Sequence, residues 1–224
     1  MTPEFVPFPK MGRWSREVIV TEKIDGTNAG IHIERIVADF DNAEYGQKLI
    51  DDPAVVVWRN DTEPGVVWAV AAQSRKRLLA PGKLTDNFGF AAWVHEHAFA
   101  LPALLGPGLH FGEWWGNGIQ RGYGLAESDK RFSLFNVHKY RAMGLDERHE
   151  TDTRPQVPGL GVVPLLDQHT FSTERVEEIK QRLVEHGSYA APGFMKPEGI
   201  IVYHTAAKAT FKSLIEADDS PKGE

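Results

Sequence analysis

Short apolar and β-branched runs, separated by glycine, proline and polar turns, recur along most of the chain. A β-branched run at residues 18–21 is followed by an alternating segment at 29–34, which predicts two strands joined by a tight connection. The same patterns predict further strands at 55–58, 66–70, 109–115, 132–137, 161–166, 197–204 and 210–216. The chain is therefore predicted to be rich in strands.

Two other segments have apolar residues at helical spacing. Residues 87–104 predict one helix, and a second helix is predicted to begin at Ser172 or Thr173 and to end near Gly187. Before the first strand, residues 1–16 combine prolines with phenylalanine and tryptophan. This composition predicts an irregular arm that is held in place by its aromatic side chains.

Composition narrows the classes of protein to be considered. The chain has 224 residues, of which 42% are hydrophobic, and no repeat or linker divides it, so we predict a single domain. A formal charge of −6 argues against nucleic-acid binding by overall electrostatics but is compatible with a local basic groove. The absence of cysteine excludes disulfides and thiolate metal sites. We find neither a signal peptide nor a membrane-spanning run, so we expect a cytoplasmic protein with no membrane contact.

The segment Glu22–Asn28, which lies between the first two predicted strands, permits two interpretations. Asp25 and Gly26 form a dipeptide that is typical of a hairpin turn, and in that case Lys23 is an ordinary solvated lysine. Alternatively, Lys23 is a nucleophile at the mouth of a pocket, with Asp25 and Asn28 on the same rim. The motif by itself does not decide between them.

Three later features are equally open when each is taken alone. Three cations in a row begin at Arg75 and form either a solvated surface or a site for a bound phosphate. Glu113 precedes the glycine-rich segment 116–124, which is either a mobile loop or a place where the backbone approaches a ligand. Phe132 and Phe135 are predicted to point to opposite sides of a strand, one into the core and one as a platform for a flat ring.

The order of these motifs resembles the covalent lysyl-nucleotidyltransferase superfamily of ATP-dependent polynucleotide ligases and mRNA capping enzymes. The likeness is strongest to RNA ligases of the bacteriophage nick-sealing branch, which share the motifs found here at Glu22–Asn28 and Phe111–Gln120. It extends over about residues 20–216. The resemblance implies an α+β nucleotidyltransferase (adenylation) domain with antiparallel sheets flanked by helices and a nucleotide cleft between them.

The resemblance also implies a role for each matched residue of the first motif. Lys23 corresponds to the lysine that becomes covalently adenylylated by ATP. Asp25, Gly26 and Asn28 complete its motif, with Asp25 expected to be catalytic. Glu22, Gly26 and Asn28 are expected to contribute to nucleotide binding.

Four further residues match later motifs of the family. Arg75 corresponds to an arginine near the nucleotide phosphate and sugar, and Glu113 to the glutamate that engages the ribose. Phe135 corresponds to the aromatic residue that stacks on adenine. Glu198 corresponds to a carboxylate that helps to hold the divalent metal, which is expected to be Mg²⁺ or Mn²⁺.

The sequence departs from the family at its last motif, Lys-x-Lys. Lys212 matches the first lysine and is expected to be catalytic, but the second position is Leu214. In the family the second lysine contacts the α-phosphate of the nucleotide. Either Lys212 serves both purposes, or Lys208 or Lys222 takes over, or the activity is impaired.

The function implied by the resemblance is that of an ATP-dependent RNA ligase. AMP on the lysine passes to a 5′-phosphate end, and a 3′-hydroxyl displaces it to seal RNA ends or a nicked duplex. The alternatives are a minimal DNA ligase and a nucleotide-binding module that no longer seals strands.

Nucleic-acid binding could come from one of two sources. Relatives usually append a further domain that grips nucleic acid, whereas we expect only the nucleotidyltransferase core here, with no separate C-terminal domain. A separate partner could supply that binding. A local basic groove of Arg75–Arg77, Arg121 and Lys130–Arg131 is the other source.

Overall fold

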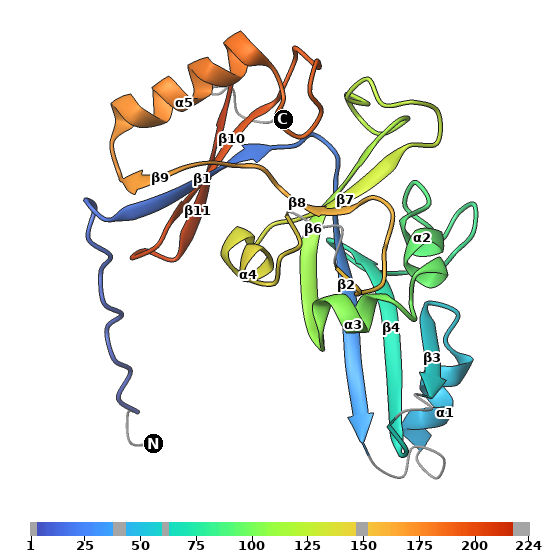
Figure 1. Cartoon of the computed structure of the whole chain (residues 1–224). Coiled ribbons are helices and arrows are strands. Elements are labelled where there is room, and N and C mark those ends of the chain that lie inside the picture. The colour runs from blue at the N-terminus through green and yellow to red at the C-terminus, as the bar shows by residue number, and fades with distance from the viewer. Residues whose placement is uncertain (1–3, 38–43, 60–62, 147–151, 217–224) are drawn as a thin grey trace. The chain divides into compact units, whose positions relative to one another are not determined.

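The chain folds into two compact units, which are described separately (Figure 1). The structure is a computed structural model that describes residues 4–37, 44–59, 63–146 and 152–216. The unit that we call terminal comprises Met1–Lys23 and Pro164–Glu224, and the central unit comprises Ile24–Val163. The prediction that the whole chain forms one domain stays a prediction.

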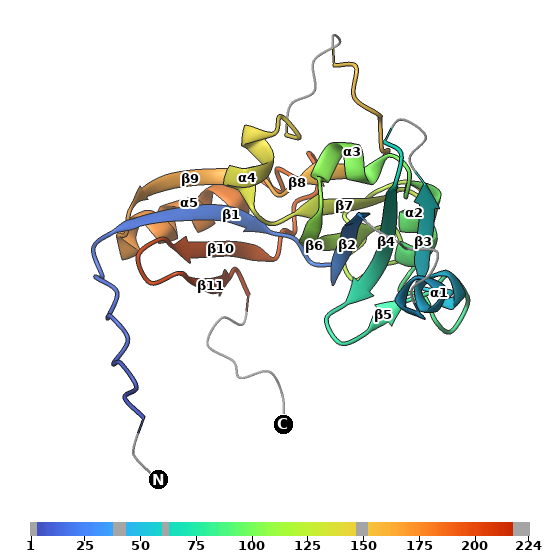
Figure 2. The same ribbon diagram turned by 90° about the horizontal axis from the view of Figure 1, so that it is seen from below.

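The terminal unit is built on a four-stranded antiparallel sheet with the strand order β11-β10-β1-β9. Figure 2 shows its helix α5 alongside this sheet. The elements are β1 (Glu17–Lys23), β9 (Leu165–Thr170), α5 (Thr173–His186), β10 (Gly199–His204) and β11 (Ala209–Leu214). The helix begins where Ser172 Oγ accepts a hydrogen bond from the N–H of Arg175 (3.2 Å) and ends before Gly187, as predicted.

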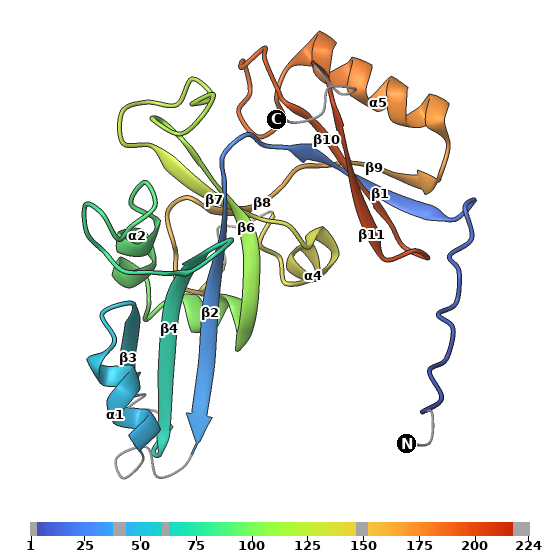
Figure 3. The ribbon, with the colours of Figure 1, turned by 180° about the vertical axis from the view of Figure 1, so that it is seen from behind.

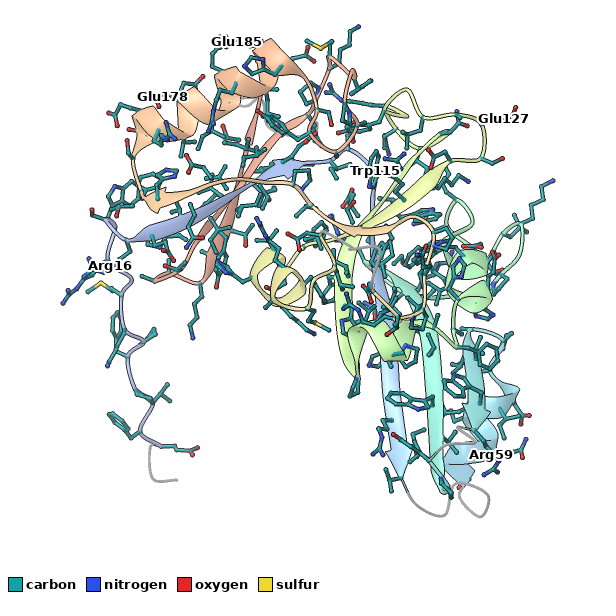
Figure 4. All side chains as sticks on the ribbon, viewed as in Figure 1. Arg16, Arg59, Trp115, Glu127, Glu178 and Glu185 are labelled. Carbon is teal, nitrogen blue, oxygen red and sulfur yellow. The ribbon has the colours of Figure 1, made fainter. Side chains whose placement is uncertain are left out.

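The two faces of this sheet differ because the side chains alternate along each strand. One face is apolar and packs on α5 through a cluster that includes Val18, Val20, Ile200, Val202, Ile179 and Leu183. Lys23 lies on the other face of β1. The outer side of α5 is charged, and Glu178 and Glu185 project from it (Figure 4).

The central unit contains a seven-stranded sheet. Six of its strands follow the order β3-β4-β2-β6-β7-β8, and the seventh, β5, pairs with β4. Its strands are β2 (Thr27–Val37), β3 (Val55–Arg59), β4 (Val66–Ser74), β5 (Leu78–Leu79), β6 (Gly108–Gly116), β7 (Lys130–Leu134) and β8 (Leu160–Val162). Its helices are α1 (Glu44–Asp51), α2 (Phe90–Glu96), α3 (Leu101–Leu105) and α4 (Val137–Ala142). Neighbouring strands are antiparallel except β7 and β8. Figure 3 shows β4, β2 and β6 side by side.

One face of the central sheet is buried in the larger of the two cores described here. Residues of α2 and α3 pack on this face, which is formed by apolar side chains such as Ile31, Ile33, Val70, Trp114 and Phe132. The opposite face carries Asn28, Glu113 and their neighbours. The alternation of buried and accessible residues along β2 and β6 therefore separates the core from the candidate site.

The predicted bounds of one helix and one strand are wrong. Residues 87–104 do not form one helix, because the chain turns between α2 and α3 and Pro102 lies in the first turn of α3. Proline lacks an N–H group and disfavours a helix that continues through it. The strand predicted at 132–137 ends at Leu134, because Asn136 caps α4 by accepting a hydrogen bond from the N–H of Lys139 (3.1 Å).

The arm is irregular over residues 4–16, as predicted, but its aromatic side chains do not all hold it in place. Trp14 packs edge-on against Phe171 with ring centroids 4.9 Å apart. Phe5 and Phe8 are instead exposed. The prediction that aromatic side chains hold the arm in place is therefore wrong for these two residues.

No helix in the described ranges has the length and apolar character needed to cross a membrane.

Candidate active site

The segment between β1 and β2 carries the chain from one sheet to the other and does not form a hairpin. β1 pairs with β9 and β10, whereas β2 pairs with β4 and β6. Gly26 lies so close to β6 that a Cβ atom would be 2.4 Å from the carbonyl oxygen of Trp114. The hairpin interpretation is therefore wrong, and glycine is required here for close approach of two backbones.

Lys23 is the last residue of β1 and faces a carboxylate that is distant in sequence. Its ammonium group donates a hydrogen bond to Glu198 and forms an ion pair with it. The two side chains are only 22% and 14% exposed, so this is not a solvated surface lysine. Glu198 immediately precedes β10, and Lys23 is in register with Gly199.

Lys212 and Leu214, which occupy the two lysine positions of the family's Lys-x-Lys motif, lie on the same face of the terminal sheet as Lys23. Lys23 pairs with Gly199, which in turn pairs with Leu214, so that these three residues form one row across the sheet. Lys212 lies on the same face one row away, because residues two apart on a strand share a face. Leu214 thus occupies the motif position that lies in the same row as Lys23.

Lys208, one of the two other lysines named for this motif, does not lie in that row. Lys208 is in the turn between β10 and β11, at the end of the hairpin where His204 pairs with Ala209. That end is the opposite one from Gly199, so Lys208 as a replacement is contradicted by the register. Lys222 lies outside the described residues.

Glu22 is buried on the opposite face of β1 from Lys23. Its carboxylate accepts hydrogen bonds from the hydroxyl of Ser188 (2.5 Å) and the N–H groups of Tyr189 (2.8 Å) and Ala190 (2.9 Å). Burial raises the pKa of Glu22, and the three hydrogen bonds oppose that rise. This side chain therefore anchors the loop after α5, and its nucleotide-binding role stays a prediction.

In the central unit, the register brings two predicted site residues, Asn28 and Glu113, onto one accessible face. Asn28 pairs with Glu113, and Glu113 pairs with Ser133. Arg75 follows Ser74, the last residue of β4, and lies in an exposed turn beside the same edge. The N–H of Gly26 also donates to Oε1 of Glu113 (3.1 Å). Residues from motifs far apart in sequence are therefore neighbours.

A second row on this face contains the predicted adenine platform. Phe132 is buried in the core, whereas Phe135 is 40% exposed, which confirms that the two rings have different environments. The N–H of Phe135 donates to the carbonyl of Phe111 (3.0 Å), so these residues lie across from each other. Phe111 also packs beside Gly30, where a Cβ atom would be 3.3 Å from its ring. The sequence analysis missed Phe111, although its spacing of two from Glu113 places both on one face.

The glycine-rich segment 116–124 is packed and holds Asp25. Arg121 Nε donates to the carboxylate of Asp25 (3.1 Å), and the backbone N–H of Asp25 donates to the hydroxyl of Tyr123 (2.8 Å). Tyr123 is buried edge-on against Trp115, with ring centroids 5.1 Å apart. The alternative of a mobile loop is therefore wrong, and Arg121 and Tyr123 position Asp25.

Most cations of the predicted basic groove make contacts within the central unit. Arg77 donates to the carbonyl oxygen of Thr85 (2.7 Å), and Lys130 donates to that of Phe88 (2.8 Å). Arg131 pairs with Asp129 (3.0 Å), and Arg121 pairs with Asp25 as described above. These contacts reduce the number of cations that are available for a phosphate backbone.

The described residues contain no group of three or more histidine, cysteine, aspartate or glutamate side chains that could hold a metal ion. Glu198 is the carboxylate adjacent to Lys23. Mg²⁺ commonly binds through one or two carboxylates together with phosphate oxygens and water. The donor set therefore fits a metal that is held largely by the nucleotide.

Comparisons with known proteins agree with this description. The model of the RNA ligase family matches residues 16–214. Two mutant structures of Naegleria gruberi RNA ligase are similar in fold: one with ATP and Mn (TM-score 0.52, 15% identity, covering 91% of this chain and 51% of that chain) and one with AMP and Mn (0.51, 16%, 96% and 58%). This chain thus spans little more than half the length of those proteins. No curated protein matches it. The predicted α+β class with antiparallel sheets is confirmed.

Proposed function

Because this chain belongs to the RNA ligase family, we propose that it is an ATP-dependent RNA ligase that works through a lysine–AMP intermediate. The observation that carries the proposal is the pairing of Lys23 with Glu198, which are 175 residues apart in sequence. A lysine held by a carboxylate at the end of a strand has a defined orientation, which a nucleophile requires.

In the proposed first step the amine nitrogen of Lys23 forms a bond to the α-phosphorus of ATP, while the bond from that phosphorus to pyrophosphate breaks. The ammonium form has no free electron pair, so it must first lose a proton. Glu198 accepts a hydrogen bond from this ammonium and so orients the amine, and the proton passes to solvent water. The product is a phosphoramidate between Lys23 and AMP.

The remaining nucleotide contacts are assigned to the accessible face of the central sheet. We assign the ribose to Glu113, the adenine to Phe135, and the phosphate and sugar to Arg75. The adjacency of Glu113 and Asn28 and the exposure of Phe135 support these assignments. The pairing of Arg121 with Asp25 leaves that carboxylate less able to repel a phosphate.

The proposed cofactors are ATP and Mg²⁺ or Mn²⁺. The Naegleria gruberi structures with ATP or AMP and Mn support this choice. Glu198, together with nucleotide phosphate oxygens, would hold the metal. When bound, the metal would neutralise charge that develops on the phosphate oxygens. Lys212, on the face that carries Lys23, would add a positive charge to the same end.

In the second proposed step AMP passes from Lys23 to a 5′-phosphate end of RNA, which frees the lysine and leaves an activated end. A 3′-hydroxyl then attacks the 5′-phosphorus and releases AMP, so that a phosphodiester bond is formed. RNA ends or a nicked duplex are the proposed substrates, and a cytoplasmic location is part of the proposal. The RNA ligase family match supports RNA as the polymer.

The mass of the intact protein, measured with and without ATP and Mg²⁺, tests the first step. We expect an increase equal to one AMP group, which Lys23→Ala should abolish and Lys48→Ala, at an exposed position on α1, should leave intact. The same preparation is then given matched nicks in RNA and DNA. An adduct that persists in Lys23→Ala contradicts the assignment of the nucleophile, and sealing of DNA nicks alone favours a DNA ligase.

A second candidate function is a nucleotide-binding module that no longer seals strands, and Leu214 is the observation that favours it. This residue is in line with Lys23, where the family motif has a lysine. Retained binding of ATP without any adduct in the wild-type chain would support this module and contradict the ligase.

A further inference from the structure

The N-terminal arm has a regular pattern with a period of three residues. Large apolar side chains occupy every third position, namely Phe5, Phe8, Met11 and Trp14. Cations occupy a second set of every third position, namely Lys10, Arg13 and Arg16. No acidic residue occurs between residues 5 and 16, although the whole chain has a formal charge of −6. The arm is therefore a basic and aromatic segment of an acidic protein.

A period of three matches the polyproline II conformation, which has three residues per turn and a rise of about 3.1 Å per residue. Pro7 and Pro9 fix their own φ angles near this conformation, and each also restricts the residue before it to extended conformations. In that conformation the apolar residues form one stripe, at intervals of about 9 Å, and the cations form a stripe beside it. Prolines therefore favour an extended arm before any ligand binds.

The structure leaves these side chains accessible, and the contacts described for the arm lie at residues 12–16. Phe5, Phe8 and Met11 are 86%, 83% and 84% exposed. Trp14 contacts Phe171, and its carbonyl oxygen accepts a hydrogen bond from Nε2 of His204 (2.8 Å). Figure 1 shows the arm as an extended run that leads away from β1, and Figure 4 marks Arg16 at its base.

We propose that residues 5–16 bind single-stranded RNA, with aromatic side chains stacking on bases and cations contacting phosphates. This proposal rests on the proposed ligase function, which identifies RNA as the polymer. Proteins that bind single strands without sequence preference combine cations that follow the backbone with aromatic rings on which bases stack. The two stripes of the arm supply both groups in a segment that needs little ordering.

The spacing of the prolines argues against the alternative that the arm is a ligand for a protein that recognises polyproline segments. Such proteins recognise prolines spaced three apart, which lie on one side of the polyproline II helix. Pro7 and Pro9 are two apart and lie on different sides. The cations of the central unit also favour the arm as the RNA contact, because Arg77, Lys130 and Arg131 are engaged in internal contacts.

Fluorescence anisotropy with a labelled, 5′-phosphorylated single-stranded RNA of about 12 nucleotides tests the proposal on the full chain. Lys10→Ala/Arg13→Ala is compared with Lys48→Ala/Lys83→Ala, which removes the same charge from exposed positions of the central unit. We expect the arm variant to bind RNA at least about fivefold more weakly and to lower the slope of log affinity against log salt by about 1.4, because each phosphate contact contributes about 0.7. The control variant should behave like the wild type.

Stacking is tested separately by Phe5→Ala/Phe8→Ala, with Leu84→Ala as the control at another exposed apolar position. Loss of stacking on one base should weaken binding by about fivefold or more. Equal affinity of the arm and control variants, or no binding of RNA by the wild type at low salt, overturns the proposal. A change of sedimentation in the phenylalanine variant with unchanged RNA binding assigns the arm to self-association of this chain and also overturns the proposal.

Adduct formation distinguishes this inference from the function on which it rests. Neither arm variant should change the amount of lysine–AMP adduct, because the arm carries none of the residues assigned to the nucleotide. If the wild type forms no adduct but binds RNA through the arm, the ligase proposal fails while the arm retains its role. If the adduct forms normally and the arm has no effect on RNA, only the inference about the arm fails.

Discussion

At the scale of single residues, the site depends on polar groups whose partners fix their orientation. Lys23 is held by Glu198, and Asp25 is held by Arg121 and the hydroxyl of Tyr123. Charged hydrogen bonds of this kind are stronger and more directional than neutral ones. The conformations of Lys23 and Asp25 are therefore determined by residues that lie outside the segment Glu22–Asn28.

His110 provides a residue-scale prediction about stability. It is fully buried, with Nδ1 2.9 Å from the hydroxyl of Tyr140 and Nε2 3.0 Å from the carbonyl oxygen of Gly106. A carbonyl only accepts, so Nε2 carries the proton and Nδ1 accepts from the tyrosine. Burial, together with the positive charge of Lys139, lowers the pKa of His110 to about 4.

The unfolded chain binds this proton below pH 6.5, whereas the folded chain does not bind it until about pH 4. Stability from this residue is therefore complete above pH 6.5 and is lost as the pH falls towards 4. We expect the free energy of unfolding, measured in urea, to be lower by about 2 kcal/mol at pH 5 than at pH 7 on account of this group. His110→Gln should flatten this dependence, and an unchanged slope in that variant would contradict the assignment.

At the scale of elements, close approach of backbones determines where strands meet. Gly26 lets the chain pass against β6, and Gly199 separates Leu214 from Lys23 in their common row. A Cβ atom at Gly199 would lie 2.3 Å from the carbonyl oxygen of Ser213. Gly26 and Gly199 therefore define strand pairing and do not provide flexibility.

Gly26→Ala tests this view. The added Cβ would meet the carbonyl oxygen of Trp114 and the Cβ of Trp115, neither of which is the mobile end of a side chain. We expect a loss of about 3 kcal/mol in the free energy of unfolding. Gly161→Ala, on β8, is the matched control because nothing lies within 4 Å of its Cβ, and it should be neutral or slightly stabilising. Equal effects of the two substitutions in urea unfolding would contradict the interpretation.

Leu214→Lys is a second prediction at this scale, and it concerns activity. It adds a cation in the row of Lys23, where developing phosphate charge is expected. We expect the rate of adduct formation to rise about tenfold or more. Thr210→Lys adds the same charge to the same face of β11, four residues away, and should have little effect. A rate that is unchanged by Leu214→Lys would mean that Lys212 already serves both positions.

At the scale of the whole molecule, the two units are assembled differently from the chain. The central unit is one continuous segment with its own core, whereas the terminal unit combines both ends of the chain. Within the terminal sheet, β1 pairs with both β9 and β10. The first 23 residues therefore supply an inner strand to a sheet whose other strands follow residue 163.

This arrangement predicts different behaviour for two fragments. Residues 24–163 should fold alone and unfold cooperatively in urea, because they retain every strand of the seven-stranded sheet. Residues 164–224 lack β1 and should remain largely unfolded, as judged by circular dichroism. A synthetic peptide covering residues 1–23 should restore structure to the second fragment. Cooperative unfolding of residues 164–224 alone would contradict the role given to β1.

The sequence by itself determined much that depends on local spacing. Alternation predicted most strands and the different environments of Phe132 and Phe135, and the spacing from Ser172 to Gly187 predicted α5. These predictions succeed because side-chain direction in a strand or helix repeats with a fixed period. At Pro102 and Asn136 the conformational preference of a single residue opposed the surrounding apolar pattern, and the predicted bounds were wrong there.

Only the tertiary structure decided which elements meet. It separated β1 from β2, although Asp25 and Gly26 are typical of a hairpin, and it joined Lys23 to Glu198 and buried Glu22 beneath the loop at Ser188. The physical reason is that strand pairing is set by hydrogen bonds and packing between distant segments, which leave no trace in the local pattern of either strand.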